Sequence, residues 1–147
     1  MQVVRLEPMT VVGIVVEARF DELGTLVPQA WKRLWEEADA IRGGLGDRFV
    51  EVSEHLGDGR YREILGLRVG GSADAPEGMV RVELPAASYV HSVHTGPLEG
   101  IAIRFGEMQD HARSLGHEPD GVLLDEGYTP DGDRPHDLYV RISTGTA

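Results

Sequence analysis

The chain has 147 residues, no cysteine and a formal net charge of −11, from 25 acidic residues against 14 lysines and arginines. The absence of cysteine excludes disulfides, thiolate metal sites and cysteine nucleophiles, and the acidity disfavours direct binding to a nucleic-acid backbone. No stretch approaches the roughly 18 apolar residues of a membrane span, and the N-terminus lacks the apolar run of a signal peptide. We therefore expect one soluble, cytoplasmic domain.

The first half of the chain begins with a strand and a helix. Residues 10–18 are almost entirely β-branched or apolar, which is typical of a central strand. A helix follows, with Thr25 as the expected N-cap, Pro28 in the first turn and Gly43 after the last turn. Its apolar positions recur at three and four residues: Val27, Trp31, Leu34, Ala38 and Ile41.

Two further strands complete this half. They are expected at residues 48–55 and 61–69, on either side of the hairpin signal LGDG. The segment 70–78, GGSADAPEG, is the most loop-like stretch of the chain and is predicted to be a linker.

The second half repeats the same order of elements. Residues 79–93 are extended, with Pro85 predicting a bend, and strands are expected at 121–128 and 136–143. A helix is expected between residues 93 and 121, and its inner face carries Leu98, Ile101, Phe105, Met108, Ala112 and Leu115.

Strand, helix, strand, strand therefore occurs twice. The sequence predicts a single α+β domain over residues 1–147, made of two β-α-β-β half-modules (about 1–69 and 79–147) related by a pseudo-twofold axis. We expect an antiparallel sheet, because the short connections cannot make parallel crossovers. A ligand groove is expected along the pseudo-twofold line.

Two strands place an acid on an otherwise apolar face. By strict alternation Glu126 shares a face with Val122, Leu124 and Tyr128, while Tyr61 and Glu63 continue the apolar face of residues 65–69. Glu126 either reaches water at the strand end or is a half-buried acid that binds a cation or handles a proton. If it binds cations, their affinity should fall at low pH, where protons compete.

Aromatic residues could complete such a groove. Trp31 and Trp35 are neighbours on the first helix, so one of them is expected at the groove edge, where an indole face attracts organic cations. Tyr89 is expected on the opposite wall, and Phe105 on the inner face of the second helix. The histidine spacing fits no metal motif, and no nucleotide-binding glycine motif is present, so we predict neither metal nor cofactor.

The arrangement resembles the GyrI-like small-molecule-binding domain, which is also the effector-binding domain of some AraC- and MerR-type bacterial regulators. The likeness rests on LPAASYVHSVHTGPLEGI (84–101), DEGY (125–128) and DLYVRI (137–142), and more loosely on the tryptophan-bearing helix. It implies a central groove in which Glu126 is the ligand-facing acid. Gly127 stands where relatives have a bulky residue, so we expect a different outer face or a bend in the strand that alters the position of Tyr128. The early first strand predicts a stand-alone member without a DNA-binding domain.

Three functions follow from this resemblance. The first is binding of hydrophobic, often cationic xenobiotics or effectors, with a sequestering or sensing role. The second is hydrolysis of strained electrophilic toxins, with Glu126 or Tyr61 as the catalytic candidate. The third is a gyrase-inhibitor-like interaction with a protein partner, in which the acidic surface would matter more than the groove.

Overall fold

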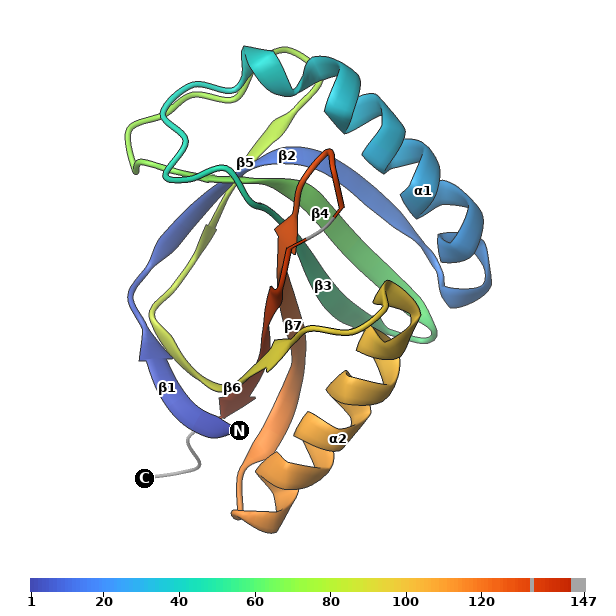
Figure 1. Cartoon of the computed structure of the whole chain (residues 1–147), viewed down its shortest axis with the longest axis vertical. Helices are drawn as coiled ribbons and strands as arrows, with labels where there is room; N and C mark the ends of the chain where they lie inside the picture. The colour runs from blue at the N-terminus through green and yellow to red at the C-terminus, as the bar shows by residue number, and fades with distance from the viewer. Residues whose placement is uncertain (133, 144–147) are drawn as a thin grey trace.

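The computed structural model describes residues 1–132 and 134–143 as an eight-stranded antiparallel sheet with two α-helices (Figure 1). This confirms the predicted α+β class. The elements are β1 (Gln2–Leu6), β2 (Met9–Arg19), α1 (Phe20–Glu37), β3 (Phe49–Gly57), β4 (Arg60–Val69), β5 (Val80–Leu84), β6 (Ala87–His94), α2 (Ile101–Ser114), β7 (Glu118–Tyr128) and β8 (His136–Ser143). Within the described residues, neither helix is both long and apolar enough to cross a membrane.

The strand order β1-β6-β8-β7-β3-β4-β2-β5 has internal symmetry. Exchanging β1–β4 for β5–β8 gives the same order read from the opposite edge of the sheet, and the pair β3·β7 lies at its centre. Each half places its first strand beside the other half, because β1 pairs with β6 and β5 pairs with β2. The half-module boundaries near residues 69 and 79 stay a prediction, and residues 144–147 of the second module lie outside the described residues.

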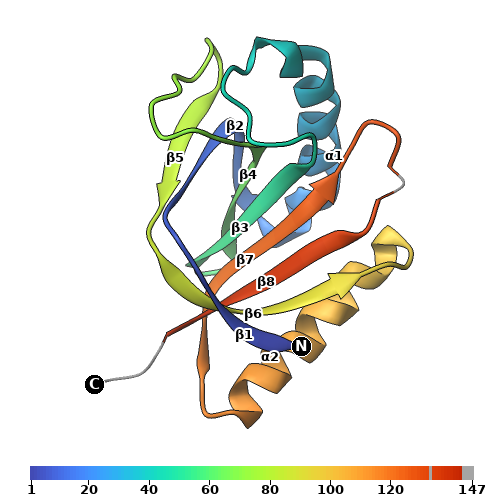
Figure 2. The same cartoon turned by 60° about the vertical axis from the view of Figure 1, so that its left-hand side comes forward.

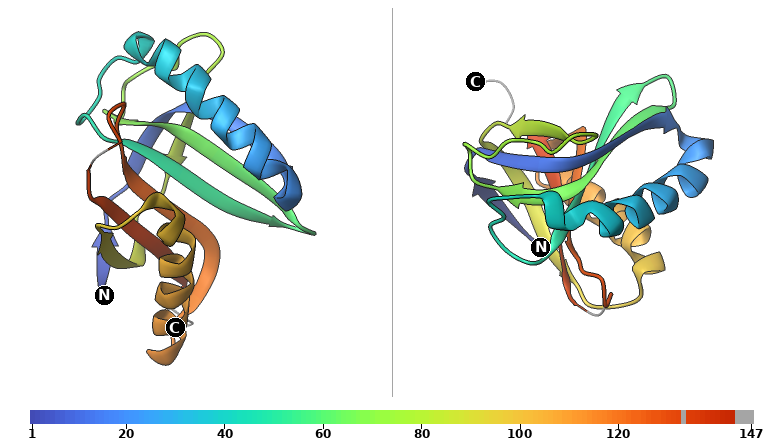
Figure 3. Two further views of the ribbon diagram at one scale, coloured as in Figure 1. Left: turned by 45° about the vertical axis from the view of Figure 1, so that its right-hand side comes forward. Right: turned by 90° about the horizontal axis from the view of Figure 1, so that it is seen from above.

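Both helices lie on one face of the sheet, α1 over β2 and β4 and α2 over β6, β7 and β8 (Figure 3). We call this the helix-covered face. The sheet curls in the other direction, as Figure 2 shows, and its helix-free face encloses a core built from strand residues only. Side chains on both faces of the central strands are therefore buried, which matters for the site below.

The first helix begins earlier than the sequence predicts. It starts at Phe20 rather than near Thr25, because the Glu22 carboxylate accepts a hydrogen bond from the backbone N–H of Arg19 (2.9 Å) and supplies a cap one turn upstream. Pro28 then lies inside the helix, where it costs the hydrogen bond to the carbonyl four residues before it. The placement of Pro28 in the first turn was wrong.

Other boundaries differ less. The α-helix ends at Glu37 and a 3₁₀ turn (Ala38–Ala40) follows, so it stops before the expected Gly43. Strand β1 was not predicted, because Pro8 separates it from the apolar run that follows. The bend at Pro85 is confirmed, since the chain leaves β5 there and enters β6, at the other side of the sheet.

Strand β7 contains a β-bulge at Gly127. Val50 of β3 pairs with Glu126 and Phe49 pairs with Tyr128, so Gly127 has no partner across the pair. A Cβ on Gly127 would lie 2.6 Å from the ring of His136, so only glycine fits there. The extra residue breaks the alternation, and Glu126 and Tyr128 point to opposite faces of the sheet. Their predicted common face is thus corrected.

Candidate functional site

Three carboxylates gather beneath the helices at the centre of the sheet. Glu51 on β3 and Asp125 on β7 are direct partners across the central strand pair, and Glu63 lies on the adjoining β4. Glu63 and Asp125 are only 4% and 5% exposed. We call Glu51, Glu63 and Asp125 the acidic cluster. Like charges held this close in a dry setting must be neutralised by hydrogen bonds, by protons or by a cation.

Hydrogen bonds satisfy part of this demand. Trp31 donates its indole N–H to Glu51 (3.0 Å), which links α1 to β3. Asp125 accepts the hydroxyl of Tyr128 on one oxygen (2.7 Å) and contacts Nδ1 of His136 with the other (2.5 Å). The Gly127 bulge makes both contacts possible, since it turns Tyr128 towards the helices and leaves room for the His136 ring.

Glu63 is the least satisfied member of the cluster. Ser53 donates its hydroxyl to one carboxylate oxygen (2.9 Å), and the other oxygen is buried without a partner among the described residues. Burial, reinforced by the charge of Glu51, raises the pKa of Glu63 to about 8 despite the bond from Ser53. With this pKa, Glu63 is mainly protonated at neutral pH.

The pKa of Glu51 is raised for the same reason. Burial raises it to about 7, the bond from Trp31 opposes the rise, and the charge of Asp125 adds to it. The pKa of Tyr128 is also raised, first by burial and then by the charges of Glu51 and Asp125, so its hydroxyl remains a donor. Two members of the cluster, Glu51 and Glu63, therefore hold their protons to a higher pH than ordinary glutamates do in the empty protein.

Aromatic rings flank the acidic cluster. Trp31 stacks on Trp35 at 5.1 Å and lies 4.4 Å from Tyr128, centroid to centroid. Trp35 meets Phe49 edge-on at 4.9 Å. Further along the same face, Tyr61 lies against Phe20 (5.8 Å) and His55 (4.8 Å). Phe105 of α2 packs on the same side of the sheet, against the core of the second half.

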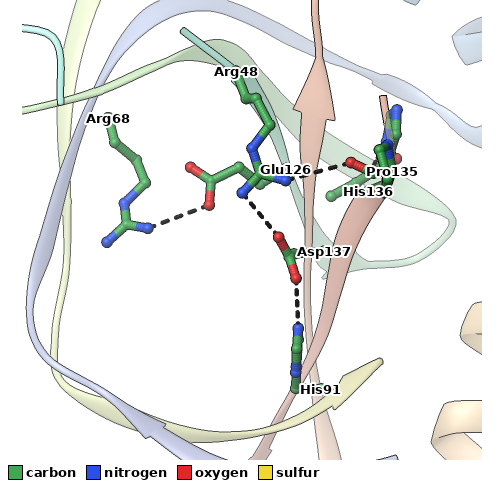
Figure 4. Close-up of polar contacts among 8 residues, drawn as sticks. Arg48, Arg68, His91, Glu126, Pro135, His136 and Asp137 are labelled. Atoms are coloured by element: carbon green, nitrogen blue, oxygen red, sulfur yellow. Dashed lines mark hydrogen bonds and ion pairs between the residues drawn. The ribbon is translucent and has the colours of Figure 1, made fainter. Parts of the chain in front are cut away.

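The opposite face carries a different polar group, which Figure 4 shows. Glu126 contacts Arg68 (3.3 Å), and Asp137 is held between Arg48 and His91, both at 2.8 Å. Burial alone would raise the pKa of Asp137, but the bonds and charges of His91 and Arg48 outweigh it and lower that pKa. Tyr89 is fully buried on this face. Each acid here has a cationic partner.

The structure thus divides the residues that the sequence selected. Trp31, Trp35, Tyr61, Glu63, Tyr128 and Phe105 lie on the helix-covered face, whereas Glu126 and Tyr89 lie on the helix-free face. The expectation that all of them line one groove is corrected, because the sheet separates the two sets. The sequence also missed Glu51, Ser53, Asp125 and His136. A signal existed for Asp125, since alternation placed it on the face opposite Glu126.

Fold and site define a small α+β protein whose central strands carry acids and aromatic rings beneath two helices. A model of the family described as integron-associated effector binding protein matches residues 2–139, and the chain belongs to that family. The resemblance to effector-binding domains is thereby confirmed, and binding of a small molecule is the general function that this family indicates. No curated protein sequence gives a significant match.

Solved structures show the same fold at low identity. A putative transcription regulation protein from Staphylococcus aureus MU50 shares 14% identity over 97% of both chains, with a TM-score of 0.70. SAV2435 bound to tetraphenylphosphonium shares 13% over 97% of this chain and 93% of that one, also at 0.70. An integron cassette protein from the mobile metagenome of Vibrio cholerae shares 12% over 97% and 95%, at 0.69.

Proposed function

We propose that this protein binds small organic cations with aromatic groups at the acidic cluster, between α1 and the central strands. One observation carries the proposal: Glu63 is buried with an unpartnered oxygen, close to a second acid whose pKa is also raised. An unpaired buried carboxylate is costly, and a ligand cation offsets that cost. Metal coordination has no comparable support, since no metal-binding arrangement of side chains occurs among the described residues.

The neighbouring rings suit the same ligand. Trp31 and Trp35 present stacked indole faces beside Glu51, and indole is the best aromatic partner for a cation. Glu63 and Asp125 are nearly inaccessible, so a bulky ligand must displace at least one ring before it reaches them. Trp31 is well placed to move, because its side chain is only partly buried. Its bond to Glu51 would be exchanged for the ligand.

Tetraphenylphosphonium is a suitable probe, since it is the ligand of one structure with this fold. The chain has only two tryptophans, and both lie at the proposed site, so intrinsic fluorescence reports binding directly. We expect Glu63→Gln to weaken binding about tenfold, equivalent to about 1.4 kcal/mol. Glu126→Gln is the matched control on the other face and should leave the affinity unchanged. The reverse result would move the ligand to the helix-free face and overturn the proposal.

The pH dependence of binding provides a second test. Cation binding favours the ionised acids, so protons must leave Glu63 and Glu51 when the ligand arrives. Affinity should therefore rise with pH from about 6 to 8, by up to about tenfold per unit for each proton released. The neutral triphenylphosphine oxide should show a much flatter profile. Equal profiles for the two compounds would contradict a role for the carboxylates.

Hydrolysis is a second candidate, favoured by one specific feature. Glu51 has a pKa of about 7, the value that suits general acid–base catalysis at neutral pH, and lies beside the hydrogen-bonded Tyr128 and Asp125. Glu51→Gln should then abolish turnover of a strained electrophile such as an epoxide, while its binding persists. Absence of turnover in the wild type would leave binding as the function.

A further inference from the structure

A pocket of about 540 Å³ opens on the helix-free face, where β2 begins and β4 and β5 end. This volume lies within the range of small-molecule sites. Its walls are largely apolar, with Met9 and Leu84 buried at the base and Leu45 exposed at the rim. The cation that lines it is Arg68, which also borders the neighbouring pocket that contains Glu126.

The guanidinium of Arg68 is incompletely paired. One terminal nitrogen contacts Glu126 at 3.3 Å, long for a charge-assisted hydrogen bond. The buried Nε–H has no acceptor among the described residues, and the other terminal nitrogen points away from Glu126 (Figure 4). A guanidinium has five N–H donors in a planar fork that fits a carboxylate in two-point contact.

The acid that also lines the pocket does not compete for Arg68. Glu83 is mostly exposed and pairs with Arg81 at 2.7 Å. A ligand that complements this pocket therefore needs an anionic head for Arg68 and a short apolar body for Met9, Leu45 and Leu84. We propose that the pocket is a second ligand site, and that it takes an amphipathic carboxylate anchored on Arg68.

The two sites differ in place and in charge. The sheet separates Arg68 from the acidic cluster, since Arg68 shares a face with Ile64 whereas Glu63 lies on the other. The acidic cluster suits cations and this pocket suits an anion. The inference therefore stands on its own residues and survives if the proposed cation binding fails.

A calorimetric titration of the protein with octanoate tests the site. Arg68→Gln should weaken binding at least tenfold, whereas Glu126→Gln should strengthen it, because removing that carboxylate frees one edge of the guanidinium and removes a like charge. Arg68→Lys, which keeps the charge and loses the fork, should fall between. Thermal melting identifies any variant that fails to fold. Because Glu126→Gln is expected to raise the octanoate affinity, loss of folding cannot imitate the expected result for that variant.

Arg62→Gln is the matched control. Arg62 lies on the same strand and face, and its Nε also lacks an acceptor within the described part of the chain. It pairs with both oxygens of Glu54, however, and does not line the pocket. Octanoate affinity should be unchanged in this variant. The inference is overturned if Arg68→Gln binds octanoate as the wild type does, if neutral octanol binds equally well, or if Glu63→Gln rather than Arg68→Gln removes binding.

Discussion

The two faces of the central sheet carry similar acids in opposite circumstances. On the helix-free face, Glu126 and Asp137 each meet an arginine, and the partners of Asp137 lower its pKa. On the helix-covered face, Glu51 and Glu63 meet neutral donors and one another, and their pKa values rise to about 7 and 8. Residue type alone does not distinguish a structural ion pair from a binding group. The partner that each acid contacts distinguishes the two.

Because their pKa values shift in opposite directions, Asp137 on one face and Glu51 and Glu63 on the other make folding stability depend on pH in opposite ways. A raised folded-state pKa stabilises the protein below the ordinary value of about 4.5, and that stabilisation is lost as pH rises through the folded value. A lowered pKa, as at Asp137, stabilises above the ordinary value and is lost as pH falls. Glu51 and Glu63 thus destabilise the folded protein at high pH, whereas the contacts of Asp137 stabilise it there.

The largest expected effect on stability comes from replacing the ionisable carboxyl group of Glu63. In the wild type this group should make stability fall by up to about 1.4 kcal/mol per pH unit between pH 5 and 8. Glu63→Gln should therefore stabilise the empty protein at pH 8, by on the order of 3 kcal/mol, with little change at pH 4.5. Urea unfolding at several pH values measures this.

Glu54→Gln is the control for that experiment, because Glu54 pairs with Arg62 on the other face (2.9 Å). It should not flatten the dependence of stability on pH. An unchanged slope in Glu63→Gln would mean that Glu63 is already ionised in the empty protein, and the contrast between the two faces would fail.

The bulge that separates the faces should be the next most sensitive feature. Gly127→Ala brings a methyl group within 2.6 Å of the His136 ring and should cost about 2 kcal/mol, since overpacking forces side chains or backbone to shift. It should also disturb the contact between His136 and Asp125, and with it the proposed cation site. Chemical denaturation and tetraphenylphosphonium titration report the two effects.

Gly24→Ala offers a comparison within the same chain. Gly24 lies inside α1 with open space around its Cα, so alanine should stabilise by about 0.5–1 kcal/mol. Equal stability of the two variants would show that the bulge tolerates a side chain.

The smallest effect is expected at the paired acids. Arg48→Gln leaves Asp137 with the hydrogen bond to His91 and should cost about 1 kcal/mol at pH 7, because the pair is partly exposed to solvent. The cost should shrink towards pH 3, as Asp137 takes up a proton. Arg33→Gln, which breaks the exposed pair with Glu37 (3.1 Å), should cost less at both pH values. A larger cost at pH 3 than at pH 7 would contradict this account.

Sequence alternation predicted part of this arrangement and failed at a definite point. It placed Tyr61 and Glu63 correctly with the apolar residues that follow them, because β4 pairs with β2 in unbroken register. It failed at Tyr128, since a bulge shifts the alternation by one residue and leaves no trace in the hydrophobic pattern. The glycine at 127 was the one visible sign.

The identity of the site acid was harder to predict. Glu126 does continue an apolar face, together with Val122 and Leu124, but that face is the one enclosed by the curl of the sheet. Glu51 falls on the alternate positions of its strand, which in a half-exposed sheet would face water. Helices cover one face here and the curl encloses the other, so neither set of positions is solvent-facing, and the pattern cannot tell which buried acid has a cationic partner.

The exchange of edge strands has a consequence for how this chain acquires its structure. Strand β1 completes the sheet of the second half and β5 that of the first, so neither half can finish its own edge. Much of the pairing joins residues distant along the chain, a topology that folds slowly and all at once. Cutting the backbone between residues 70 and 78 should give two fragments that stay unfolded apart and recover the native sheet only when mixed.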